Sequence, residues 1–212
     1  MNEQILIFYS ISVLILTLSP GPDILFLIST TLNKNFKTAL NVATGLSLGL
    51  LIHTIFTAFG LGYLFTEHPR LISLTRLIGC IYLGYLSYLY FPKKNSISGI
   101  NHNFNFIEKP LLQGLVMNLI NPKIILFFVS FFPQFIFHNK WEIKTQFYIL
   151  GLMFTTIAFV TFVSVLSVLN LTKSQMKLGK QSKNISYLSS AMLLGLSAYF
   201  FWEEINYIME LI

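Results

Sequence analysis

Long apolar runs alternate with short polar breaks along the chain. Each run is about as long as the ~20 apolar residues that a helix needs to cross the hydrocarbon core of a bilayer. The six runs cover residues 5–32, 42–65, 71–91, 111–137, 145–171 and 185–202. The pattern predicts an all-α polytopic membrane protein with six transmembrane helices, which form a single membrane domain over residues 1–212.

The polar breaks predict the orientation of these spans, because loops rich in lysine and arginine resist translocation and stay in the cytoplasm. Nine lysines fall in the first, third and fifth breaks, whereas three basic residues fall in the second and fourth. We therefore expect the central loop, residues 92–109, in the cytoplasm and both termini in the periplasm. An alternative is that the first segment folds back without crossing, which would leave five spans and a cytoplasmic N-terminus.

A proline interrupts the first apolar run in each half of the chain. Pro22 and Pro122 stand 100 residues apart (122 − 22). Three spans per half is an odd number, so two halves of the same fold must be inverted relative to each other. We expect repeat 1 over about 1–91 and repeat 2 over about 110–212, each with a Pro-broken first helix. Because proline is frequent in membrane helices, a chance coincidence is the alternative.

Composition and charge narrow the function classes. Hydrophobic residues make up 54% of the chain and charged residues only 10%, whereas a soluble domain carries about 25% charged residues. Lipid is therefore the expected partner. The net charge of +6 is scattered over the breaks and forms no patch, so no nucleic-acid partner is expected. The single Cys80 and four scattered histidines give no reason to expect a metal site or a cofactor.

The strongest local motif is Ser19-Pro20-Gly21-Pro22-Asp23. Its two prolines remove backbone donors and its glycine permits a sharp turn, so a continuous helix is not expected here. Opened backbone is tolerated within hydrocarbon only where protein or a water-filled cavity covers it. We expect the break to face the bundle interior, where the amides of a half-helix that begins near Pro22 would attract a carboxylate.

Two charged residues of opposite sign follow the two breaks. Asp23 is an ionisable group within a membrane segment, which suggests a function; the alternative is that it only caps the half-helix or stabilises its dipole. Lys123 follows Asn118, Asn121 and Pro122, and it either shares one cavity with Asp23 or extends to the cytoplasmic headgroups. We predict that both charges lie on the inward sides of their helices.

The second apolar run carries a stripe of small residues that ends in a histidine. Gly45, Gly49 and His53 recur every four residues, so they share one helix face. The glycines are expected to let another helix pack closely. His53 is either a proton relay or a neutral histidine that is hydrogen-bonded in the interior. Arg76, near one end of the third run, is expected to reach the outer headgroups.

In order and spacing, these motifs resemble those of the lysine exporter (LysE/RhtB) family. They are Ser19-Pro20-Gly21-Pro22-Asp23, the Gly45-Gly49-His53 stripe, Gln113-Gly114-Leu115, Asn118-Leu119-Ile120-Asn121-Pro122-Lys123 and Phe131-Phe132-Pro133-Gln134-Phe135. The resemblance implies a bacterial inner-membrane protein of about six helices that exports amino acids or their derivatives. It also implies that the proton gradient drives export, and it is compatible with a homodimer. It does not identify the substrate.

The expected function is therefore transport. We expect the carboxylate of an amino acid to meet the half-helix amides near Pro22 and the ammonium of Lys123, while Asp23 and His53 couple export to inward proton movement. An alternative is an exporter of another small solute or of a divalent metal cation, although scattered histidines make a poor soft-metal site. An intramembrane enzyme is a remote alternative, since neither a His-Glu-x-x-His nor a Gly-x-Ser-x-Gly motif occurs.

Overall fold

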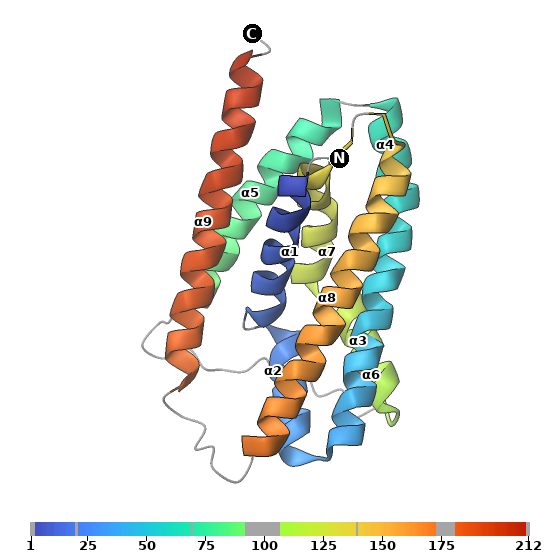
Figure 1. Cartoon of the computed structure of the whole chain (residues 1–212), viewed down its shortest axis with the longest axis vertical. Helices are drawn as coiled ribbons and strands as arrows, with labels where there is room; N and C mark the ends of the chain where they lie inside the picture. The colour runs from blue at the N-terminus through green and yellow to red at the C-terminus, as the bar shows by residue number, and fades with distance from the viewer. Residues whose placement is uncertain are drawn as a thin grey trace.

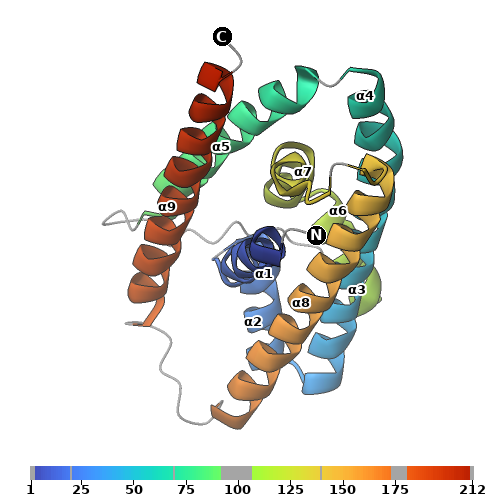
Figure 2. The same cartoon turned by 45° about the horizontal axis from the view of Figure 1, so that its top comes forward.

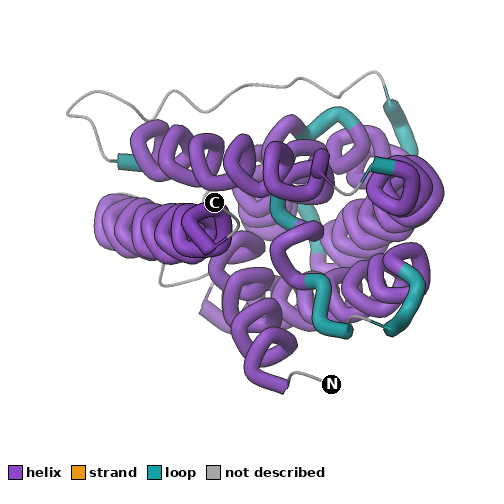
Figure 3. Tube along the Cα trace, turned by 90° about the horizontal axis from the view of Figure 1, so that it is seen from above, coloured by secondary structure: helices purple, strands orange, loops and turns teal. Residues whose placement is uncertain are grey.

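The computed structural model describes residues 3–19, 21–68, 70–91, 107–138, 140–172 and 181–210. Every regular element in these ranges is helical (Figure 3), which confirms the predicted all-α class. In chain order the elements are α1 (Glu3–Leu18), α2 (Pro22–Asn33), α3 (Phe36–Phe56), the π-helical turn η1 (Thr57–Leu61), α4 (Gly62–Glu67), α5 (Arg70–Tyr90), α6 (Pro110–Leu119), α7 (Pro122–Ser130), the 3₁₀ turn η2 (Phe132–Phe135), α8 (Ile143–Thr172) and α9 (Gln181–Glu210). Pro20 and most of the predicted central loop lie outside the described residues.

Three stretches are long and apolar enough to cross a membrane: Phe36–Glu67, Leu71–Leu89 and Ile143–Leu171. Two bent pairs add two further candidates if each pair is one span: α1 with α2, bent by 55°, and α6 with α7, bent by 50°. The described chain therefore holds three to five candidate spans. α9 has 30 residues but is not among the apolar stretches, so the sixth span stays a prediction, as does the inverted-repeat relation.

The helices form a ring around two central elements. Figure 2 shows α1 and α7 in the middle, with α9, α5, α4, α3 and α8 around them. α5 and α9 run side by side on one flank, and α3, α6 and α8 lie on the other (Figure 1). The α5–α9 pair meets the rest of the molecule mainly through α1 and α7.

The bends occur where the prolines fall. α2 begins at Pro22 and α7 begins at Pro122, so each proline occupies a first-turn position, where its missing N–H is not needed. The side chain of Asn121 caps α7 by accepting from the amide of Lys123 at 3.0 Å. The corresponding residue before α2 is Gly21, which provides no side-chain cap. The first amides of α2 therefore remain available for another partner.

Gly45 and Gly114 let α3 and α6 cross with their backbones in contact. A Cβ atom on Gly45 would collide with the carbonyl oxygen of Leu111, and one on Gly114 would collide with that of Val42. Small residues permit such close approach between membrane helices. The crossing holds α6 against the glycine stripe and thereby brings Asn118, near the end of α6, into the interior.

Aromatic side chains tie α1 and α7 to α8. The hydroxyl of Tyr9 in α1 donates to the carbonyl oxygen of Leu150 in α8 at 2.7 Å. The rings of Phe127 and Phe128 in α7 pack against Phe154 of α8, with centroid separations of 5.2 and 5.4 Å. These contacts hold the two central helices, α1 and α7, in place against α8.

Candidate functional site

The two helix breaks meet around one buried cavity. Gly21 and Asp23 line it from the first break, and Asn118, Asn121 and Lys123 line it from the second. Its volume of about 20 Å³ is room for a single water molecule. Sequence-distant breaks therefore share one small polar hollow inside the bundle.

Lys123 bridges from the second break to the first. Its ammonium group donates to the carbonyl oxygens of Leu16 at 2.6 Å and of Ser19 at 3.0 Å. In an uninterrupted helix the carbonyl of Leu16 would accept from the amide of residue 20, but that residue is proline and has no N–H. The cation thus satisfies the Leu16 acceptor that the proline leaves free and the Ser19 acceptor that follows the end of α1, which explains why a buried lysine is stable at this place.

Asp23 faces the same interior. Its Oδ2 atom accepts from the side-chain amide of Asn118 at 3.1 Å, and both side chains are buried. The N-cap position of α2 is occupied by Gly21, so Asp23 is not the capping residue. Its place in the first turn still favours a negative charge through the helix dipole. The structure therefore places Asp23 and Lys123 inward, where both line the same cavity.

Four buried polar atoms at the breaks lie outside hydrogen-bond geometry with any partner among the described residues: Ser19 Oγ, Asp23 Oδ1, Asn118 Oδ1 and Asn121 Nδ2. The side-chain amide of Asn121 nevertheless interacts with the carboxylate of Asp23. Leaving one such group unpaired in the interior costs about 1–3 kcal/mol. Both kinds of group occur, since the carboxylate and carbonyl oxygens accept and the amide nitrogen donates. The hollow is thus chemically suited to a small ligand that carries donors and acceptors together.

His53 lies beside this cluster but does not line the cavity. Its Nε2 atom is 3.3 Å from the carbonyl oxygen of Asn118, and its ring packs against that of Phe128 at 5.4 Å between centroids. Gly49, one turn earlier, makes room for the amide of Asn118, because a Cβ atom there would come within 2.5 Å of Asn118 Oδ1. Asn118 therefore separates His53 from Asp23 and contacts both.

The apolar wall of the cavity contains residues that the sequence reading missed. Leu50 of α3 and three α8 residues, Phe154, Ala158 and Phe162, also line the cavity. They lie within long apolar runs, where a residue that lines a cavity cannot be distinguished by its type from one that faces lipid. The four-residue spacing in α8 is the signal that could have found them.

Of the two prolines that begin α2 and α7, Pro122 is exposed and Pro22 is half-buried. Both therefore act through their effect on the backbone.

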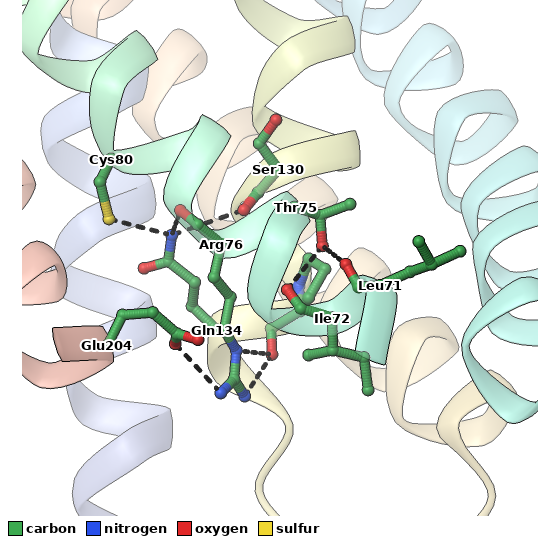
Figure 4. A network of polar contacts seen from close by, with 9 residues as sticks. Leu71, Ile72, Thr75, Arg76, Cys80, Ser130, Gln134 and Glu204 are labelled. Carbon is green, nitrogen blue, oxygen red and sulfur yellow. Dashed lines mark hydrogen bonds and ion pairs between the residues drawn. The ribbon is translucent and has the colours of Figure 1, made fainter. Parts of the chain in front are cut away.

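A second charge cluster, made by the half-buried Arg76 and the buried Glu204, lies between α5, η2 and α9 (Figure 4). The guanidinium of Arg76 donates to the carbonyl oxygen of Pro133 from Nε at 3.1 Å and from Nη2 at 2.9 Å. Its Nη1 atom lies 3.5 Å from Oε2 of Glu204. The expectation that Arg76 reaches the outer headgroups is therefore wrong. The reason is that Glu204, buried on α9, supplies a counter-charge within the protein.

In the described part of the chain, no group of three or more His, Cys, Asp or Glu side chains is placed to hold a metal ion. Broken helices of membrane length that surround a buried, charged hollow are the architecture of a membrane transporter. Residues 14–204 match the model of the LysE type translocators, and the chain belongs to that family. The family resemblance is confirmed, and the family is one of transporters rather than enzymes.

Three relatives illustrate the match. A leucine efflux protein of Enterobacter sp. (strain 638) is 31% identical over 160 residues, which are 73% of this chain and 72% of that protein. A membrane protein of Vibrio cholerae is 30% identical over 160 residues, covering 74% of this chain and 77% of the relative. A membrane protein of Pseudomonas aeruginosa is 30% identical over 137 residues, covering 60% and 62%. No solved structure matches the chain.

Proposed function

We propose that this protein exports amino acids, or derivatives of them, across the bacterial inner membrane and that inward proton movement drives the export. The observation that carries the proposal is the meeting of two proline breaks, each followed by a charge of opposite sign, around one cavity. The similarity to a leucine efflux protein supports amino acids as the class of substrate.

The polar groups of the hollow match the two charges of an amino acid. Its ammonium group would donate to the unpaired oxygens of Asp23 and Asn118. Its carboxylate would accept from the uncapped first amides of α2 and from the ammonium of Lys123. Charged hydrogen bonds of this kind are stronger than neutral ones, so the site would select a zwitterion over a neutral solute.

Proton coupling follows from competition for one carboxylate. Asp23 can hold the substrate's ammonium group when it is ionised, and it loses that attraction when it is protonated. Protonation from the periplasmic side would therefore release the amino acid outward, and deprotonation toward the cytoplasm would reset the site. His53 would relay the proton past Asn118, to whose carbonyl oxygen it lies close.

Access to the hollow requires movement, because room for one water molecule is too little for an amino acid. The conformation is thus closed around the site. We infer that repeat 1, residues 1–91, and repeat 2, residues 110–212, rock against each other as inverted halves of one domain. Lipid would cover the exposed apolar side chains, and the family resemblance also allows a homodimer.

The proposed orientation places both termini in the periplasm and the loop at 92–109 in the cytoplasm. In Figure 1, α1 begins and α9 ends at the same, upper end of the molecule. The turn between α2 and α3 lies at the opposite end and carries Lys34, and Lys37 follows in the first turn of α3. A cytoplasmic position for that end agrees with the positive-inside rule.

The test uses purified protein in vesicles loaded with radiolabelled leucine. We expect rapid exchange with external unlabelled leucine and faster efflux when the outside is made acidic, with a protonophore removing the acceleration. Asp23→Asn and His53→Ala should lose the dependence on the pH gradient. If both variants keep the full acceleration, neither residue couples transport to protons. If the wild-type protein exchanges no amino acid, the proposed function is wrong.

A further inference from the structure

The apolar wall of the hollow points to one class of amino acid. We propose that the substrate is a neutral amino acid with an aliphatic side chain and that Ala158 of α8 sets the size of the side chain accepted. The inference rests on the proposed function, because it assumes that the polar end of the cavity holds the two charges common to all amino acids.

The wall is a single face of α8 with one contribution from α3. Phe154, Ala158 and Phe162 follow one another at intervals of four residues, so they stack along the same side of the helix. Together with Leu50 they line the cavity that Asp23 and Lys123 line from the helix breaks. The side of the cavity formed by α3 and α8 is therefore entirely apolar, whereas the side formed by the breaks carries all the charged groups, together with the apolar side chains of Leu16, Ile24 and Ile124.

This division orients a bound amino acid. Its ammonium and carboxylate groups share one carbon atom, so both must lie at the polar end, and the side chain must then extend toward α8. Asp23 and Lys123 are the ionisable members of the cavity lining, and the backbone charges of the substrate occupy both. A lysine or glutamate side chain would place an unpaired charge against phenyl rings, which is strongly unfavourable. An aliphatic side chain would bury apolar surface there.

Ala158 is the position that determines how much space the cavity has for the side chain of a substrate. It is buried with 1% of its surface exposed, and it lies between two phenylalanines of the same stripe. Phe154 is held by the rings of Phe127 and Phe128, so it cannot easily move aside. The methyl group of Ala158 therefore leaves a notch between two large side chains, and a larger residue there would fill it.

The experiment measures exchange of radiolabelled alanine, leucine, phenylalanine, lysine and glutamate in vesicles that contain the purified protein. The wild-type protein is expected to exchange leucine at least about tenfold faster than lysine or glutamate. Ala158→Val should lower the leucine-to-alanine ratio about tenfold, and Phe162→Ala should raise the phenylalanine-to-leucine ratio by a similar factor. Ala158→Val makes the cavity smaller and Phe162→Ala makes it larger. Either variant alone can therefore test the proposal if the other fails to fold.

Val160→Phe is the matched control, because Val160 lies on the same helix but is 58% exposed, on the side away from the cavity. It should leave all ratios as in the wild-type protein. A preference for lysine or glutamate would overturn the inference, as would ratios in both cavity variants equal to those of the control. In these cases amino-acid exchange itself would still support the proposed function. Loss of exchange for every amino acid in the wild-type protein would contradict both.

Discussion

Two cations among the described residues, the buried Lys123 at the centre and the half-buried Arg76 on the flank, are stabilised in the same way. Each donates to carbonyl oxygens that a helix end leaves free. Lys123 bonds the carbonyls of Leu16 and Ser19 at the first break, and Arg76 bonds that of Pro133 in the turn after α7. Backbone carbonyls thus replace water around the buried Lys123 and part of the water around the half-buried Arg76.

The two clusters differ in what surrounds the cation. Arg76 of α5 lies 3.5 Å from a carboxylate oxygen of Glu204 in α9, and both residues stand on uninterrupted helices. Lys123 and its acidic counterpart Asp23 each follow a helix-breaking proline and face a cavity. The Arg76 cluster joins the α5–α9 pair to the bundle, whereas the central cluster surrounds a space.

Unpaired atoms occur in both clusters. In the flank cluster Glu204 Oε1, Gln134 Oε1 and Ser130 Oγ lack hydrogen-bond partners among the described residues, and in the central cluster Ser19 Oγ and Asn118 Oδ1 lack them. A buried charge or an unpaired polar atom within a membrane is therefore not in itself a sign of a transport site. The central cluster is distinguished by its two helix breaks and by the cavity that Asp23 and Lys123 line.

The largest expected effect comes from replacing the acid of each cluster by its amide. Asp23→Asn should slow leucine exchange about 100-fold, because losing a charged hydrogen bond of about 3 kcal/mol reduces binding by that factor. Glu204→Gln should leave exchange per folded molecule within about threefold. Vesicle exchange, normalised to the monodisperse protein, gives both numbers. Equal losses in the two variants would remove the distinction between a substrate cluster and a structural one.

The breaks themselves could be predicted from sequence, because the effect of proline on a helix is local. Pro22 and Pro122 mark the starts of α2 and α7 as expected. The glycine stripe was equally visible, since the four-residue spacing places Gly45 and Gly49 on one face in any helix. Such features need no knowledge of the neighbouring helices.

Features that depend on the placement of distant helices could not be predicted. The partner of Arg76 is Glu204, 128 residues away (204 − 76) on a helix near the end of the chain, and no local pattern links them. The carbonyl acceptors of Lys123 are backbone atoms, which have no sequence signature beyond the missing N–H of residue 20. Ala158 is hidden for another reason: a small apolar residue in an apolar run looks the same whether it lines a cavity or faces lipid.

A smaller effect is expected on stability when the flank cluster is broken. Arg76→Ala leaves the buried carboxylate of Glu204 without its cation and should lower the free energy of unfolding by about 2 kcal/mol. This loss is smaller than that for a fully buried ion pair, because the Arg76 side chain is 23% exposed. Adding Glu204→Ala should restore part of the loss, as measured by a double-mutant cycle in detergent. Additive losses would mean that the two side chains do not interact.

The smallest effect concerns one buried hydroxyl in each cluster. Ser19 Oγ at the central break and Ser130 Oγ in the flank cluster both lack partners among the described residues. Figure 4 shows Ser130, whose carbonyl oxygen, not its hydroxyl, faces the amide of Gln134. Since removing an unpaired buried hydroxyl relieves a desolvation penalty, Ser→Ala at either position should leave stability unchanged or raise it by up to about 1 kcal/mol. Only Ser19→Ala should slow leucine exchange, by about fivefold for one lost neutral hydrogen bond of about 1 kcal/mol. If Ser130→Ala slows exchange as much, the substrate path includes the flank cluster, and the contrast between the two regions fails.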